Sequence, residues 1–166
     1  IKQQIKAETS SKCAYCESKI GHNTPGDIEH KVPSSLDLEL HFEWTNLTLA
    51  CTECNRRKSD YFSEEKPFLD PYADNVEELV EHYGPVVSWK NGHESAEITV
   101  KTLELHSQAR VELILRKVDL LNELNERLER FATQANGILK EIHRKEIEDM
   151  RDVRSEFSGM IKSVLS

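Results

Sequence analysis

Cys13-Ala14-Tyr15-Cys16 and Cys51-Thr52-Glu53-Cys54 are two CxxC pairs, which lie 34 residues apart and contain every cysteine of the 166-residue chain. Each CxxC turn brings two sulfur atoms to one side, so two turns together can complete a tetrahedral site of four thiolates. Two other interpretations are four unrelated buried thiols and a redox-active dithiol. The spacing favours a structural Zn²⁺ site. Because four sulfur ligands leave no position for a substrate, catalytic residues are expected elsewhere.

Three polar segments lie between and just after the cysteine pairs. They read Asp27-Ile28-Glu29-His30-Lys31-Val32-Pro33, Trp44-Thr45-Asn46-Leu47 and Cys54-Asn55-Arg56-Arg57-Lys58-Ser59-Asp60. A neutral histidine such as His30 can accept the proton of a water molecule near pH 7. A carboxylate and an amide oxygen can hold Mg²⁺, which keeps several of its waters and accepts phosphate oxygens. With lysine and arginine to hold the phosphate, these groups supply what phosphodiester hydrolysis requires.

This arrangement resembles the HNH, or ββα-metal, nuclease family, including the form in which CxxC pairs flank the motif. The resemblance implies that His30 is the general base and that Glu29 and Asn55 bind a catalytic Mg²⁺ or another divalent metal. It also implies that Asn46 fixes the loop between two strands and orients the base, and that Lys58 contacts the phosphate. Nucleic-acid contacts are expected from the basic residues of the motif, which are Lys31, Arg56, Arg57 and Lys58.

Other residues of the motif region have less specific interpretations. Asp27 shares a strand face with Glu29 if side chains alternate along the strand, which leaves a role as a second metal ligand open. His22 and His41 are more simply explained as solvated or structural residues. Trp44 is expected to be a core aromatic residue.

The whole chain divides into three stretches: an N-terminal stretch, a middle stretch and a helical C-terminal stretch. Residues 1–72 hold all cysteines and form the expected nuclease core. Residues 73–104 start with a short acidic helical pattern at 75–82. Two β-prone runs at 86–90 and 96–100 then flank Asn91-Gly92, a pattern typical of a hairpin. This middle stretch is therefore expected to be a short helix with a β-hairpin.

Residues 105–166 have a helical pattern. Apolar residues recur three and four positions apart, at Leu121, Leu124, Leu128, Phe131, Ala135, Ile138 and Ile142. Because Asn136-Gly137 interrupts this stripe, one long helix and a helical hairpin both remain open. The predicted fold class is α+β: a zinc-stapled ββα-metal core, a small β-hairpin insertion and a long helical C-terminal region.

The net charge of the chain indicates how strongly it can attract nucleic acid. The formal net charge is −8, so the nonspecific electrostatic attraction to nucleic acid should be weak outside the basic cluster at 56–58.

The motif, the segment Lys66-Pro67-Phe68-Leu69-Asp70-Pro71-Tyr72 and the long helix resemble the HNH nucleases of Septu-type and retron-associated anti-phage systems. The resemblance implies a cytoplasmic prokaryotic nuclease that works with an ABC/SMC-like ATPase subunit and cleaves nucleic acid, with DNA favoured over RNA.

The helical region is expected to bind that partner, while packing on its own domain and homodimerisation stay open. No apolar run reaches the roughly 18 residues that cross a bilayer, so no membrane association is expected.

Two other functions also remain open: a zinc-ribbon module that binds nucleic acid without cutting it, and a helical scaffold whose zinc region serves folding alone. Cleavage that depends on His30 would separate the nuclease from both.

Overall fold

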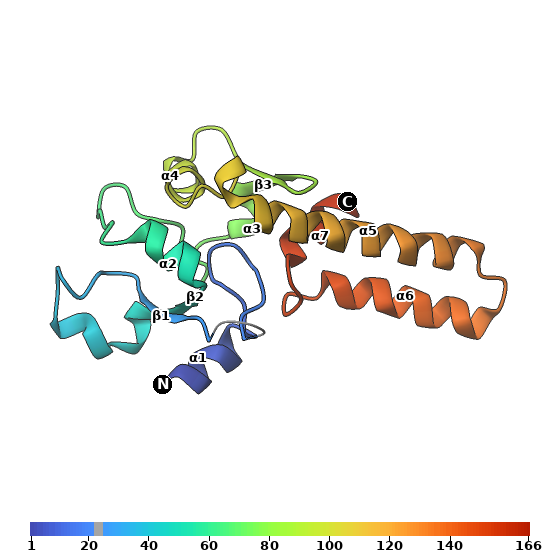
Figure 1. Ribbon diagram of the computed structural model, residues 1–166, viewed down its shortest axis with the longest axis horizontal. Coiled ribbons are helices and arrows are strands. Elements are labelled where there is room, and N and C mark those ends of the chain that lie inside the picture. Colours follow the sequence, from blue (N-terminus) through green and yellow to red (C-terminus); the bar gives the residue numbers. More distant parts are fainter. Residues whose placement is uncertain (22–24) are drawn as a thin grey trace.

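The computed structural model describes residues 1–21 and 25–166 (Figure 1). Its elements are, in chain order, α1 (Lys2–Glu8), β1 (Asp27–His30), η1 (Glu39–Phe42), η2 (Trp44–Asn46), β2 (Leu47–Ala50), α2 (Thr52–Lys58), α3 (Val76–Leu79), β3 (Val80–Tyr83), β4 (Val86–Trp89), α4 (Glu94–Thr102), η3 (Gln108–Arg110), α5 (Val111–Thr133), α6 (Gly137–Arg151) and α7 (Ser158–Val164). This mixture of helices and strands, with clustered cysteines and long C-terminal helices, confirms the predicted α+β class.

The N-terminal part is built on a strand-strand-helix unit. Strands β1 and β2 pair antiparallel, with Glu29 opposite Thr48 and His30 opposite Leu47. Helix α2 begins directly after β2, and the Cys51 sulfur caps it by accepting a hydrogen bond from the Cys54 amide. Residues 31–46, with η1 and η2, connect the strands. The unit therefore brings the Glu-His segment, the end of β2 and the start of α2 together.

The β-hairpin lies one strand earlier than the sequence pattern predicted. It consists of β3 and β4, joined at Gly84-Pro85, where Gly84 has a φ of 58°. The predicted return strand at 96–100 is wrong, because these residues belong to helix α4. Ala96, Val100 and Leu103 recur at helical spacing and are fully buried, so core packing selects the helix over the β-prone composition. The predicted helix at 75–82 likewise shrinks to α3.

The C-terminal region forms a helical hairpin, one of the two alternatives that the sequence left open. Helices α5 and α6 run antiparallel and extend away from the rest of the molecule (Figure 1). Asn136 ends the connection and caps α6, since its Oδ1 accepts hydrogen bonds from the amides of Ile138 and Leu139. The apolar stripe divides accordingly: Leu124 is fully buried, whereas Ile138 and Ile142 are exposed.

One hydrophobic core joins the three stretches of the chain. It includes Ile5 of α1, Leu49 of β2, Val100 of α4, Leu124 of α5 and Ile161 of α7. The helical hairpin is thus rooted in the same core as the cysteines, and the domain boundaries at 72/73 and 104/105 stay predictions. Among the described residues, no helix is both long and apolar enough to span a bilayer.

Candidate metal centre and active site

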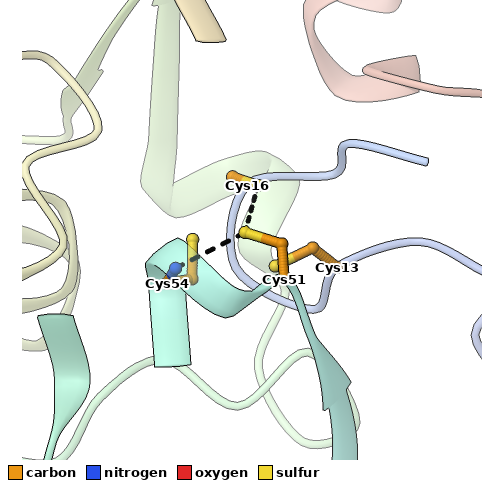
Figure 2. A group of neighbouring side chains, drawn as sticks. All are labelled: Cys13, Cys16, Cys51 and Cys54. Carbon is orange, nitrogen blue, oxygen red and sulfur yellow. Dashed lines mark hydrogen bonds between the residues drawn. The ribbon is translucent and has the colours of Figure 1, made fainter. Parts of the chain in front are cut away.

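The four cysteines gather at one point, where the loop after α1 meets the start of α2 (Figure 2). Their sulfur atoms all lie within 4.8 Å of one another, and none of the four forms a disulfide. Cys13, Cys16 and Cys54 are buried and Cys51 is half-buried. Four convergent sulfur donors fit a tetrahedral thiolate site, which is the coordination that Zn²⁺ prefers in structural sites.

The first cysteine pair sits in a tight turn. The Cys13 amide donates to the Ser18 carbonyl and the Glu17 amide donates to the Cys13 carbonyl, at 2.9 and 3.0 Å. Glu17 adopts a positive φ of 61°, which reverses the chain directly after the second cysteine. The Ala14 amide donates to the Leu49 carbonyl at 2.8 Å, so the turn is attached to β2. Backbone hydrogen bonds therefore hold both sulfurs of this pair toward the second pair.

Two buried cations, which the sequence pattern did not identify, lie beside the cysteines. The Arg110 guanidinium is 3.5 Å from the Cys54 sulfur, and Lys117 lines the same cavity as Cys13 and Cys16. Both belong to the region from residue 105 onward, far from the CxxC pairs in sequence. Burial raises the pKa of the Cys13 thiol. A metal cation would offset that effect, because metal coordination deprotonates thiols.

His30 ends β1 beside the loop that contains η1. Its Nε2 lies 3.0 Å from the carbonyl oxygen of His41, and its ring stacks on that of His41 at 4.6 Å between centroids. Because a carbonyl can only accept, Nε2 is the protonated nitrogen of neutral His30. Nδ1 is then left as the acceptor, and no hydrogen bond among the described residues engages it. In this tautomer Nδ1 is the nitrogen of His30 that can accept a proton.

Glu29 points to the opposite side of β1 from His30 and lies in the interior. Its Oε1 is 2.7 Å from Lys58 Nζ and accepts a hydrogen bond from the Tyr15 hydroxyl at 3.4 Å. Both charged side chains are almost fully buried, with exposed fractions of 3% for Lys58 and 4% for Glu29. Burial raises the pKa of Glu29, although the Lys58 ammonium opposes the rise. In this arrangement the carboxylate expected to bind metal is occupied by a lysine.

Asn55 is paired with the other acid of β1. Its Nδ2 donates to Asp27 Oδ2 at 3.2 Å, and both side chains are only partly buried. This leaves the Asn55 amide oxygen beside a carboxylate, a combination of hard oxygen donors that suits Mg²⁺. The hydrogen bonds therefore join Asn55 to Asp27, and Glu29 to Lys58.

Asn46 holds the connection between the two strands. Its Oδ1 accepts from the Val32 amide at 2.7 Å, and its Nδ2 donates to the carbonyls of Val32 and Leu40 at 3.0 and 3.1 Å. The Lys31 amide donates to the Asn46 carbonyl at 2.9 Å. These bonds fix the backbone that directly follows His30, so a buried amide restrains the position of that residue.

The basic residues expected at nucleic acid all take part in ion pairs within the chain. Lys31 is 2.8 Å from Asp70 and lies over the Tyr72 ring, and Arg56 is 2.8 Å from Glu53. Arg57 pairs with Glu53 and with Glu104. Lys58 is buried, so its ammonium is out of reach of a phosphate at the surface. Arg56 remains the most exposed of the four.

Three remaining residues of the motif region differ in their surroundings. The His41 Nδ1 lies 2.7 Å from the Ser34 hydroxyl oxygen, so His41 supports His30 from the connecting loop. Trp44, which was expected to be a core residue, is 40% exposed, so that expectation is wrong. His22 lies outside the described residues.

Comparison with known proteins agrees with this geometry. The HNH endonuclease family model matches residues 13–61, which span both cysteine pairs, β1, β2 and α2. The Septu protein PtuB of Bacillus mycoides (strain KBAB4) is 27% identical over an alignment 164 residues long. The match covers 75% of this chain and 56% of that protein. The Septu protein PtuB of Bacillus thuringiensis is 24% identical over an alignment 176 residues long. That match covers 99% of this chain and 68% of that protein.

The chain thus corresponds to little more than half of one relative and about two thirds of the other. No solved structure gave a significant match. These similarities confirm the resemblance that the two CxxC pairs and the Glu29-His30 segment predicted. Residues 13–61 carry the HNH endonuclease motif, in a chain similar to the Septu protein PtuB.

Proposed function

We propose that the chain is a metal-dependent HNH endonuclease that hydrolyses phosphodiester bonds of nucleic acid. The observation that carries this proposal is the arrangement on the ββα unit: a histidine whose Nδ1 has no hydrogen-bond partner in the described part of the chain ends β1, and an asparagine-carboxylate pair joins β1 to α2. A zinc ion held by Cys13, Cys16, Cys51 and Cys54 stabilises the unit. A second divalent metal, Mg²⁺ or another hard cation, belongs to the asparagine and a β1 carboxylate.

The proposed base is His30. Its Nδ1 takes a proton from the attacking water, while the His41 carbonyl keeps the proton on Nε2 and so fixes the tautomer. Asn46 fixes the backbone after His30 and thereby orients the ring. The ring stacked on His41 is restrained on one face, which keeps Nδ1 directed consistently. Positioning of this kind reduces the entropy lost on reaching the transition state.

Asn55 and Glu29 are the metal ligands that the family motif implies. Asp27 is a third oxygen donor, on the same side of β1 as Glu29. When bound, the metal polarises a phosphate oxygen and stabilises the leaving oxygen. Asp27 already contacts Asn55, whereas Glu29 would have to leave Lys58 in order to bind. Lys58 donates to the His30 carbonyl at 2.9 Å, so it positions the base even while its ammonium is buried.

We further propose a setting in bacterial antiviral defence, in the cytoplasm, with an ABC/SMC-like ATPase subunit and with DNA favoured over RNA. The similarity to Septu proteins supports the defence role. An acidic chain whose motif arginines and lysines are paired internally would bind phosphates weakly alone, which favours a partner that supplies positive charge. The exposed Ile138, Leu139 and Ile142 at the end of the helical hairpin offer that partner, or a second copy of the chain, a contact surface.

The decisive experiment incubates the chain, with and without its ATPase subunit, with plasmid DNA and total RNA in Mg²⁺. Cleavage is expected from the wild type and not from His30→Ala. The matched control is His93→Ala, which removes an exposed histidine outside the motif. Cleavage that survives in His30→Ala contradicts the assignment of this site. Binding of nucleic acid without any cleavage would favour a non-catalytic zinc-ribbon module, and the absence of both would favour a helical scaffold.

A further inference from the structure

Two cations, Arg110 and Lys117, are buried near the four cysteines: Arg110 contacts the Cys54 sulfur, and Lys117 lines the cavity that Cys13 and Cys16 also line. Arg110 ends η3 and Lys117 lies in the second turn of α5, with exposed fractions of 6% and 2%. Among the described residues, no carboxylate lies within ion-pair distance of either side chain. A buried cation without a compensating anion costs several kcal/mol, so this placement requires a source of negative charge.

Arg110 contacts the cysteine cluster through both terminal nitrogens. Nη1 and Nη2 lie 3.6 and 3.5 Å from the Cys54 sulfur, and Nη1 also donates to the Leu103 carbonyl at 3.0 Å. A neutral thiol is a weak hydrogen-bond acceptor, whereas a charge-assisted bond to a thiolate is far stronger. The forked contact therefore suits Cys54 as a metal-bound thiolate.

Lys117 approaches the same cluster from α5. It follows Arg110, the residue directly before α5, by seven positions. Its ammonium lies 5.4 Å from the centre of the Phe157 ring, and the residue lines a cavity together with Cys13 and Cys16. The nearby Glu17 carboxylate already accepts hydrogen bonds from Lys12 and Ser158. The cysteine side of the cavity is therefore a source of negative charge for Lys117 in addition to Glu17.

Four thiolates around one divalent cation leave two negative charges in a buried site, and Arg110 and Lys117 bring two positive ones. We infer that these two residues neutralise the four-cysteine metal centre, and that metal binding thereby holds the start of α5 against the nuclease segment. The inference rests on the proposed zinc site. Residues that support metal ligands from outside the coordination shell typically change metal affinity by about 10- to 100-fold when replaced.

Helix α5 is the first helix of the helical hairpin, so the metal centre would also set the position of that hairpin. The hydrogen bonds from Arg110 and the core contacts of Leu113 and Leu120 meet at the root of α5. Loss of the metal would leave two buried cations without compensation at this root. The expected consequence is local loosening of the first turns of α5, rather than of its far end at Thr133.

The test compares zinc retention against a competing chelator in Arg110→Met and Lys117→Met, which remove charge and keep length. The matched control is Arg116→Met, because Arg116 lies on the same helix but is exposed and pairs with Glu156. We expect each buried variant to bind zinc about 10- to 100-fold more weakly, with the control unchanged. Arg110→Lys and Lys117→Arg keep the charge and should retain zinc nearly as the wild type does.

Hydrogen exchange gives a second readout that does not depend on activity. Zinc removal from the wild type should speed exchange in residues 111–120 more than in 124–133. Circular dichroism identifies any variant that fails to fold, and the charge-keeping variants then carry the comparison. If the wild type binds zinc and all variants retain it equally, the inference is overturned while the zinc site stands. If the wild type takes up no zinc, the proposed zinc site fails, and the inference with it.

Discussion

Lys58 Nζ and Glu29 Oε1 lie 2.7 Å apart in an ion pair that is almost completely shielded from solvent. The pair joins the last turn of α2 to the middle of β1, one residue before His30. Lys58 also donates to the His30 carbonyl, so the same ammonium holds two consecutive residues of the strand. A buried pair of this kind depends on both partners, because removing one leaves an uncompensated charge in the interior.

Replacing Lys58 by methionine should therefore destabilise the zinc-loaded chain strongly. The expected loss in the free energy of unfolding is about 3–5 kcal/mol, because Glu29 stays buried without its cation. Urea unfolding followed by circular dichroism measures this. The double variant Glu29→Gln/Lys58→Met should recover a large part of the loss, since it buries no lone charge.

The exposed pair between Arg56 and Glu53 is the control for this effect. Arg56→Met should cost less than about 1 kcal/mol, because exposed ion pairs contribute little. Equal, small losses in Lys58→Met and Arg56→Met would show that the ion pair of Lys58 and Glu29 is not formed in solution.

Asp27 should contribute to binding the catalytic metal, because its carboxylate contacts the Asn55 side chain. Asp27→Asn keeps the size and loses the charge, so the Mg²⁺ concentration needed for half-maximal cleavage should rise about 10- to 100-fold. A Mg²⁺ titration of plasmid cleavage measures this. Asp149→Asn, which changes an exposed acid of α6, should have no effect. An unchanged Mg²⁺ requirement in Asp27→Asn would leave Glu29 as the β1 carboxylate that binds the metal.

The sequence predicted those parts of the fold that depend on local spacing. Paired CxxC turns were enough to predict the cysteine cluster, and the Glu29-His30 segment was enough to predict the HNH resemblance. The position of the hairpin was not predictable in this way, because Ala96 to Val100 is β-prone in composition and becomes helical only by packing on the core. Arg110 meets Cys54 across 56 residues of sequence, a contact that only the tertiary structure creates.

His41 should act on cleavage through its ring, which stacks on His30 with an interplanar angle of 22°. His41→Ala removes the stacked ring but keeps the carbonyl that accepts from His30 Nε2. The rate constant kcat should fall by up to about 100-fold as the base becomes less well positioned, with little change in KM. His41→Phe preserves the stacking and should keep most of the rate. If His41→Phe loses as much as His41→Ala, stacking is not what positions His30.

His82 should make the chain less stable in mild acid. The pKa of His82 is lowered from 6.5 to about 4, mainly by burial and also by the nearby Lys117 ammonium, while Glu17 opposes the shift. Its Nδ1 is buried and has no hydrogen-bond partner among the described residues. The unfolded chain therefore binds a proton at a higher pH than the folded chain does, and the free energy of unfolding falls as the pH drops from 6.5 toward 4.

The full effect amounts to up to about 3 kcal/mol, at roughly 1.4 kcal/mol for each pKa unit. Urea unfolding at several pH values between 7 and 4.5 measures it, with His82→Gln compared with the wild type. The wild type should lose more stability than His82→Gln over this range, whereas the exposed His93→Gln should follow the wild type. Because protonation of the cysteines weakens metal binding equally in all three proteins, only the difference between them reports His82. Identical pH profiles for wild type and His82→Gln would mean that His82 is hydrated in solution and titrates normally.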